Sequence, residues 1–300
     1  MRPLQRLAFA VAGVVSIAAP LVAQRPLKVY ISVDMEGIAG VVSNEQLGPS
    51  GFEYERARHF MTNETLAAIR GAREAGATEI VVSDSHGNGQ NLLIDDFPDD
   101  VTIIRSWPRP LGMMQGIDST FAAVVFIGYH ASTANLAGVR AHTESSASFT
   151  GMQFNGVELP EGGINAAIAG YYGVPVVAMS GDDAAVEEVR RFTGPIQAAV
   201  VKRAISFHSA ATMTPRAAQE LIRQRVKAGV EQRATAKPYV LRGDVTLDLS
   251  FKNYRAVEAL AYLPIVQRTT SHSIRYVGRN VLEVQKFLQF VTTYQVDLAP

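Results

Sequence analysis

Short apolar runs alternate with helical segments over the first two thirds of the chain. The apolar runs are rich in β-branched residues and predict buried strands at residues 28–33, 79–83, 101–105, 122–128 and 174–179. Between them, helices are predicted at 52–75, 164–172 and 182–192. Near-continuous apolar strands separated by helices are typical of a mostly parallel sheet that is covered on both faces. The pattern therefore predicts an α/β fold with three αβα layers.

Two regions depart from this alternation. Residues 149–159 alternate apolar and polar positions around Asn155-Gly156, which predicts an antiparallel hairpin excursion. Beyond about residue 200 the chain predicts a smaller α+β region, with a helix from Pro215, strands at 240–251 and 273–277, and a helix at 281–294. We predict one domain at 24–200 and a second at 201–300. A single continuous domain is the alternative, because no repeat or linker marks the boundary.

The N-terminal segment has the layout of a secretory signal peptide. Arg2 and Arg6 lie in a basic start, an uncharged apolar run follows at 7–19, and the small residue Ala23 stands at the predicted cut. We predict a signal peptide at 1–23 with cleavage after Ala23. A membrane anchor is the alternative, but the run is shorter than the ~20 residues that a spanning helix needs. The mature protein is therefore predicted to be exported, periplasmic or secreted, with no membrane contact after cleavage.

Composition excludes several classes of function. Hydrophobic residues make up 47% of the chain and charged residues 19%, which indicates a folded protein with a sizeable core. The 28 basic residues balance 28 acidic ones, so no excess of positive charge favours a nucleic-acid partner. The chain has no cysteine, which rules out disulfides, thiolate metal sites, iron–sulfur clusters and a thiol nucleophile. Any metal must be held by nitrogen and oxygen.

Potential metal ligands collect where the predicted strands end. Asp34 and Glu36 follow the first strand, Asp84 and His86 follow the second, and His130 follows the strand at 122–128. Carboxyl ends of parallel strands meet at one edge, where ligands bind in open α/β sheets. Residues two apart in an extended segment project to the same side, so Asp34 and Glu36 can face one point. Imidazole together with carboxylate suits zinc, and also manganese or iron, whereas magnesium and calcium sites hold oxygen alone. We therefore predict a metal site, with zinc ranked first.

Two further residues extend this site. Glu161 precedes Gly162-Gly163, between the hairpin and a helix, and is a candidate fifth ligand. His142 lies in an irregular stretch and is the candidate for proton transfer. Five ligands exceed the three protein ligands of a usual single catalytic zinc. The simpler interpretation is a two-metal site in which Asp34 is the shared carboxylate.

Each of these residues also has an ordinary structural interpretation. An Asp-x-Glu pair can cap a helix, and loop histidines and glutamates are usually solvated. Asp84-Ser85-His86 has the residue types of a serine-hydrolase triad, but three consecutive residues cannot point at one another, and no G-x-S-x-G elbow is present. Three further histidines are not assigned to the metal: His59, His208 and His272.

Four short motifs, in this order, resemble the zinc-dependent D-aminopeptidase family. They are SVDMEG at 32–37, SDSH at 83–86, GYHA at 128–131 and EGGINA at 161–166, and the similarity spans residues 28 to about 200. The resemblance implies a binuclear centre with two zinc ions per subunit, removal of N-terminal D-amino acids from short peptides, and a ten-subunit ring. It also implies zinc ligands at Asp34, Glu36, His86, His130 and Glu161, and a catalytic histidine at His142.

The sequence therefore predicts an exported zinc metallo-aminopeptidase. We expect it to hydrolyse N-terminal amino acids, of D-configuration by resemblance, from short peptides such as those containing D-Ala, by means of metal-activated water. Three alternatives use the same features. One is another binuclear-metal amidase or esterase, the second is an exported solute-binding protein, which would show no zinc-dependent turnover, and the third is a zinc-storage or purely structural role.

Overall fold

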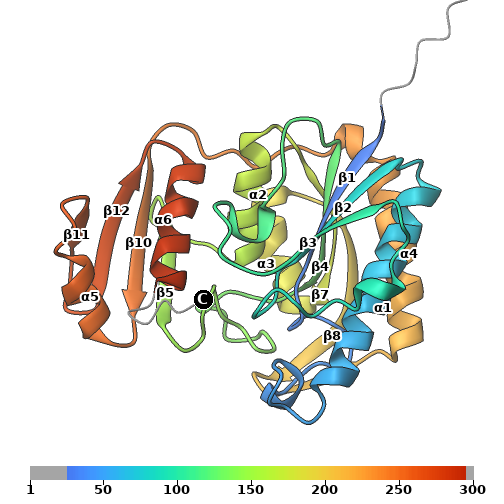
Figure 1. Ribbon diagram of the computed structural model, residues 1–300, viewed down its shortest axis with the longest axis horizontal. Coiled ribbons are helices and arrows are strands. Elements are labelled where there is room, and N and C mark those ends of the chain that lie inside the picture. The colour runs from blue at the N-terminus through green and yellow to red at the C-terminus, as the bar shows by residue number, and fades with distance from the viewer. Residues whose placement is uncertain (1–25, 295–300) are drawn as a thin grey trace, which may run out of the picture.

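The protein is built on two β-sheets that lie side by side (Figure 1). The computed structural model describes residues 26–294, so the predicted signal peptide at 1–23 lies outside the described residues. Within 26–294, no helix is both long and apolar enough to cross a membrane. The larger sheet is covered by helices on both faces, and the predicted α/β fold with a mostly parallel sheet is confirmed.

The larger sheet has seven strands in the order β3-β2-β1-β4-β7-β8-β9. Six strands run parallel, and β9 pairs with β8 in the antiparallel direction. Every residue of β4 and β7 is buried, as expected for central strands covered on both faces. The strands are β1 (Lys28–Val33), β2 (Glu79–Asp84), β3 (Val101–Ile104), β4 (Ala123–Tyr129), β7 (Val176–Asp182), β8 (Gln197–Ser206) and β9 (Ser209–Thr212).

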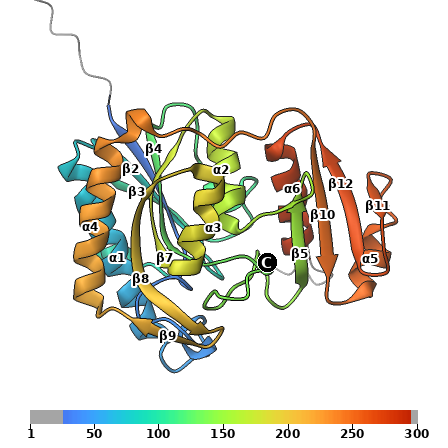
Figure 2. The same cartoon turned by 180° about the vertical axis from the view of Figure 1, so that it is seen from behind.

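Two helices cover each face of this sheet. On one face, α1 (Tyr54–Glu74) packs against α4 (Pro215–Glu231). On the other face lie α2 (Glu161–Tyr171) and α3 (Asp183–Thr193), as Figures 1 and 2 show from opposite sides. Helix α3 begins where the Asp182 side chain accepts a hydrogen bond from the Ala185 N–H, which satisfies one of the free N–H groups of its first turn.

The second sheet has five antiparallel strands in the order β11-β12-β10-β5-β6. The predicted hairpin at 149–159 is confirmed, and Asn155 and Gly156 at its tip both have positive φ, 52° and 77°. The strand predicted at 240–251 begins only at Val245. The remaining elements are β5 (Phe149–Phe154), β6 (Val157–Glu158), β10 (Val245–Phe251), α5 (Tyr254–Leu260), β11 (Val266–Arg268), β12 (Ser273–Gly278) and α6 (Val281–Thr293). Short 3-10 turns occur at Asn44–Gln46, Ile94–Asp96, Gly112–Met114 and Arg233–Thr235.

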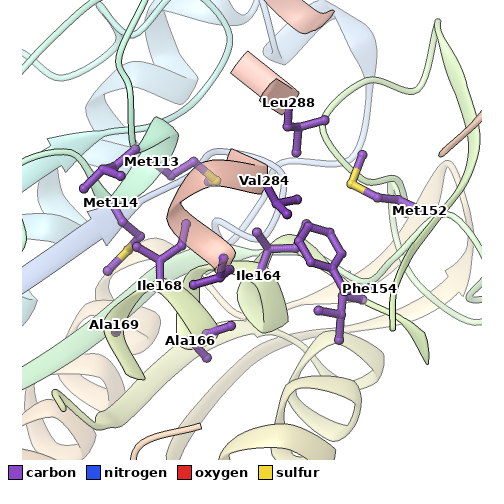
Figure 3. Close-up of a cluster of buried hydrophobic side chains, with 14 of the residues drawn as sticks. Met113, Met114, Met152, Phe154, Ile164, Ala166, Ile168, Ala169, Val284 and Leu288 are labelled. Atoms are coloured by element: carbon purple, nitrogen blue, oxygen red, sulfur yellow. The ribbon is translucent and has the colours of Figure 1, made fainter. Parts of the chain in front are cut away.

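Of the two hydrophobic clusters in the described part of the chain, one contains residues of both sheets. Strand β5 pairs with β10, so the hairpin is an integral part of the second sheet. Figure 3 shows α6 contributing Val284 and Leu288 to a cluster that also contains Ile164 and Ile168 of α2. Strands β8 and β9 and helix α4 belong to the larger sheet and its cover. The division between the sheets therefore does not follow the predicted boundary at residue 200.

Candidate metal centre

Five predicted ligands meet at the carboxyl edge of the larger sheet. Strand β1 lies between β2 and β4, and all three run in the same direction, so the segments that follow them leave at one edge. The helix predicted at 164–172 begins at residue 161, which places the fifth ligand in the first turn of α2 rather than in a loop. Each of the five residues is at most 6% exposed: Asp34, Glu36, His86, His130 and Glu161.

The carboxylate of Asp34 faces a different histidine with each oxygen. His86 Nδ1 lies 3.3 Å from Asp34 Oδ1 and 2.9 Å from Glu36 Oε2. His130 Nε2 lies 3.2 Å from Asp34 Oδ2 and 3.4 Å from Glu161 Oε2. The residues therefore form two groups of nitrogen and oxygen donors that have Asp34 in common. Each group contains imidazole and carboxylate donors, the residue types that hold a metal ion such as zinc.

Backbone carbonyls orient both imidazole rings. His86 Nε2–H donates to the Leu47 carbonyl at 2.7 Å, and His130 Nδ1–H donates to the Ala131 carbonyl at 3.0 Å. These bonds leave the opposite nitrogen of each ring facing the carboxylates, as outer partners do for metal-ligating histidines. Among the described residues, three buried atoms of the cluster lack a hydrogen-bond partner: Asp34 Oδ2, Glu36 Oε2 and His130 Nε2. Buried acceptors that converge without a donor between them match a cation site.

The cluster carries an excess of negative charge. Burial disfavours a charged ring, but Glu36 and Asp34 outweigh it and raise the pKa of His86 well above its usual value. Burial is likewise outweighed at His130, where Glu161 and Asp34 raise the ring pKa. The carboxylates thus attract positive charge strongly, as protons on the rings or as metal ions that replace those protons.

Two glycines let the segments after β1 and β4 approach each other. Gly37 N–H donates to the Gly128 carbonyl at 2.7 Å, and Asp34 N–H donates to the Ile127 carbonyl at 2.8 Å. A Cβ on Gly37 would lie 2.1 Å from the Tyr129 carbonyl oxygen. A Cβ on Gly128, which has φ +71°, would lie 2.2 Å from the Asp34 carbonyl oxygen. Only glycine at both positions allows Asp34 and His130 to come together without displacement of the backbone.

A buried lysine holds the loop that carries the two acidic ligands. Lys202, on β8, is 2% exposed, and its ammonium donates to the carbonyls of Glu36, Ile38 and Val41. From the other side, Glu64 of α1 accepts the Ala39 N–H at 2.9 Å. Lys202 was not predicted from the sequence, because a lysine in a strand normally faces solvent. The sequence feature that indicates burial of Lys202 is the run of alanine and valine at 198–201 directly before it.

His142 faces the cluster from the open side. Its Nδ1–H donates to the Arg140 carbonyl at 2.7 Å, so Nε2 carries the free lone pair. Nε2 lies 4.0 Å from Glu36 Oε1 and 3.9 Å from Glu161 Oε1. The ring stacks on His130 at 4.0 Å between centroids. With its side chain 15% exposed, His142 is more accessible than the five buried ligands, as a group that exchanges protons with substrate must be.

The cluster opens into a cavity of about 540 Å³, large enough for a small peptide. We call it the metal cavity. The side chains of Trp107, Gln289 and Thr292 form part of its wall. Glu144, which the sequence analysis did not select, also lines the cavity, and its backbone N–H donates to Glu161 Oε1 at 2.7 Å. Burial, with the nearby Glu161 and Asp34 carboxylates, raises the pKa of Glu144 to about 8. In the sequence, the feature that connects Glu144 with the site is its position two residues after His142.

Asp84 and Ser85 make other contacts, although Ser85 also lines the metal cavity. Asp84 accepts the backbone N–H groups of Asn91 at 2.6 Å and Leu92 at 2.8 Å, so it holds the loop after β2. The Ser85 hydroxyl contacts those of Ser32 and Ser83, which gives it a structural role. The three histidines that were not assigned to the metal are exposed: His59, His208 and His272.

Buried carboxylates and imidazoles that open into a peptide-sized cavity, at the carboxyl edge of a parallel sheet, define the site of a metal-dependent hydrolase. The model of the D-aminopeptidase family (Peptidase_M55) matches residues 27–290. This chain therefore belongs to the D-aminopeptidase family and is a metallo-aminopeptidase. The family resemblance seen in the four sequence motifs is confirmed.

Individual relatives agree with this assignment. A D-aminopeptidase of Bacillus subtilis (strain 168) is 31% identical over 269 residues, which covers 89% of this chain and 97% of the relative. A solved structure, described as the Zn-dependent D-aminopeptidase DppA from Bacillus subtilis, a self-compartmentalizing protease, superposes with a TM-score of 0.85. It is 30% identical in sequence, and the match covers 89% of this chain and 97% of that one.

Proposed function

We propose that this protein is an exported aminopeptidase that uses two zinc ions to release N-terminal D-amino acids from short peptides. The observation that carries the proposal is the Asp34 carboxylate, whose oxygens face His86 and His130 separately. Glu36 completes one group of donors and Glu161 the other. The nitrogen and oxygen donors suit zinc, and the Zn-dependent relative supports this choice of metal.

Zinc lowers the pKa of a water that it binds and polarises a carbonyl, which is the chemistry that peptide hydrolysis needs. The protein supplies the proton transfer. Because the Arg140 carbonyl fixes the tautomer of His142, Nε2 is the atom that accepts a proton from the attacking water. The same atom then returns the proton to the leaving amine. Burial of the five ligands excludes bulk water from the donor atoms.

The free amino group of the substrate needs an anionic partner, and Glu144 is the candidate. Its carboxylate lines the same cavity as the metal-ligand candidates, and a cation beside it stabilises its ionised form. We expect Glu144→Gln to raise KM for aminoacyl substrates about tenfold or more, with a smaller change in kcat. Steady-state kinetics will show this. An unchanged KM would exclude Glu144 as the partner of the ammonium group.

The principal experiment combines metal analysis with a screen of D- and L-aminoacyl amides, with and without chelator. We expect about two zinc ions per chain, zinc-dependent release of the D-residue, and much slower release of the L-residue. His142→Ala should keep its metal and lose about 10²–10⁴-fold in kcat. Full activity in that variant would show that His142 is not the proton-transfer group, and hydrolysis that survives metal removal would refute the zinc mechanism.

Export and assembly form a further part of the proposal. The pattern at 1–23 supports export, and the self-compartmentalizing relative supports a homo-oligomer, for which the resemblance implies a ten-subunit ring. We expect secreted or periplasmic protein to begin at Gln24 and to elute with the mass of a closed ring. N-terminal sequencing after cell fractionation, and light scattering, will test these two expectations separately.

A further inference from the structure

A second cavity of about 440 Å³ adjoins the metal cavity, and His142 and Ser146 line both. Its walls come from both sheets, since they include Phe149 at the start of β5 and Phe207 between β8 and β9. The two cavities differ in charge. Four carboxylates line the metal cavity, whereas the second cavity is lined by Arg140, Lys252 and His208, and none of its lining residues within 26–294 is acidic.

Arg140 is built into this second cavity rather than lying on the surface. It is 7% exposed, and its guanidinium lies 4.8 Å from the centre of the Phe207 ring. One nitrogen, Nη2, donates to the Asn44 side chain, but Nε is buried and has no hydrogen-bond partner among the described residues. A buried guanidinium with an unused donor is costly unless an anion joins it.

The segment that carries Arg140 is fixed in place. It belongs to the connection between β4 and β5, which lies between the two sheets (Figures 1 and 2). The Val139 N–H donates to Asp182 Oδ2 at 2.8 Å, and the Ser132 hydroxyl donates to Glu188 Oε1 at 2.6 Å. Across the cavity, the Lys252 ammonium donates to the Ser146 carbonyl at 2.5 Å. The positive groups are therefore held at a set place beside His142.

We propose that Arg140 and Lys252 bind the C-terminal carboxylate of the peptide substrate, so that the enzyme selects very short peptides with a free carboxylate. This inference rests on the proposed aminopeptidase function. A short peptide is a zwitterion, and the two adjoining cavities offer an acidic partner for its amino end and a basic partner for its carboxyl end. His142 lines both cavities, and its Nδ1 lies 2.7 Å from the Arg140 carbonyl oxygen, so the second cavity begins directly beside the proton-transfer ring. This adjacency suits a dipeptide or tripeptide.

The test compares two substrates that differ only in the charge at the C-terminus, D-Ala-Gly and D-Ala-glycinamide. For the unaltered enzyme we expect kcat/KM for the acid to exceed that for the amide about tenfold to a hundredfold, the size of a charge-assisted contact. In Arg140→Met this ratio should fall towards one. Lys252→Met, at an exposed position, should lower it by a smaller factor. The matched control is Arg203→Met, an exposed arginine on β8 outside both cavities, for which the ratio should not change.

The ratio separates the possible outcomes. If neither substrate is hydrolysed, the proposed function fails. If both are hydrolysed at equal rates by the unaltered enzyme, the aminopeptidase function stands and the carboxylate site is refuted. A ratio that survives in both Arg140→Met and Lys252→Met would also refute it. Because the ratio is measured within one preparation, partial misfolding of a variant does not change its meaning, and Lys252→Met gives the answer if Arg140→Met does not fold.

Discussion

The close approach of the segments after β1 and β4 can be tested with a single methyl group. In Gly128→Ala, the new Cβ would lie 2.2 Å from the Asp34 carbonyl oxygen and 2.6 Å from Ile38 Cδ1. The alanine would also have to adopt φ +71°. Gly173→Ala is the matched control, because Gly173 has φ +76° but, among residues 26–294, no heavy atom lies within 4 Å of its ideal Cβ. The pair separates the backbone effect from the collision.

The expected magnitudes follow from these distances. The left-handed conformation costs an alanine about 1–2 kcal/mol, and this applies to both variants. At Gly128 the backbone must also move by nearly 1 Å to restore a contact above 3 Å, and overpacking of this kind adds about 1–3 kcal/mol. The atom that the new methyl group displaces is the carbonyl oxygen of Asp34, a candidate metal ligand. Since a 1 Å misplacement near reacting groups lowers rates about 10²-fold, Gly128→Ala should lose activity as well as stability.

Urea unfolding measures the free energy of unfolding of each variant. Hydrolysis of a D-aminoacyl amide gives kcat/KM, and elemental analysis gives the metal content. We expect Gly128→Ala to be about 1–3 kcal/mol less stable than Gly173→Ala, and to have lower kcat/KM and metal content. Gly173→Ala should keep its activity. If the two variants have equal stability and full activity, the close contact at Gly128 does not position the ligands, and our account of the site is wrong.

Three further changes test separate contacts. Asp34→Asn should lower the metal content of the purified protein to one ion or fewer per chain, by elemental analysis, because both groups of donors lose a charged oxygen. Lys202→Met removes a donor from the carbonyls of Glu36, Ile38 and Val41, of which that of Ile38 still accepts the Val41 N–H. It should destabilise the protein by about 3 kcal/mol in urea unfolding, and an unchanged free energy of unfolding would contradict the role of Lys202 in holding this loop. Burial raises the pKa of Glu64 to about 8, so between roughly pH 5 and 8 the unfolded state holds fewer protons at this group and stability falls as pH rises. In Glu64→Gln the part of this pH dependence that is due to Glu64, up to about 1.4 kcal/mol per pH unit, should disappear. If the free energy of unfolding of Glu64→Gln falls with pH as steeply as that of the unaltered protein, the raised pKa of Glu64 is refuted.

The sequence predicted the elements that depend on local pattern. Continuous apolar runs predicted the central strands, and the acidic and imidazole residues after them converge as expected. The pairing of β5 with β10 was not predicted, because about ninety residues separate the two strands and no local signal links them. Glu144 and Arg140 were passed over for the same reason: their importance comes from which cavity they face, and that depends on the connection between β4 and β5 as folded.

Helix α6 belongs to the second sheet, yet its residues Gln289, Thr292 and Thr293 form part of the wall of the metal cavity. The candidate metal ligands come from the strand ends of the larger sheet and from α2, so they and these α6 residues are encoded in separate stretches of the gene. Substitutions along this helix offer a route to enzymes with altered substrate range in which the reacting centre is left intact. Directed evolution aimed at these three codons would explore that range with few changes.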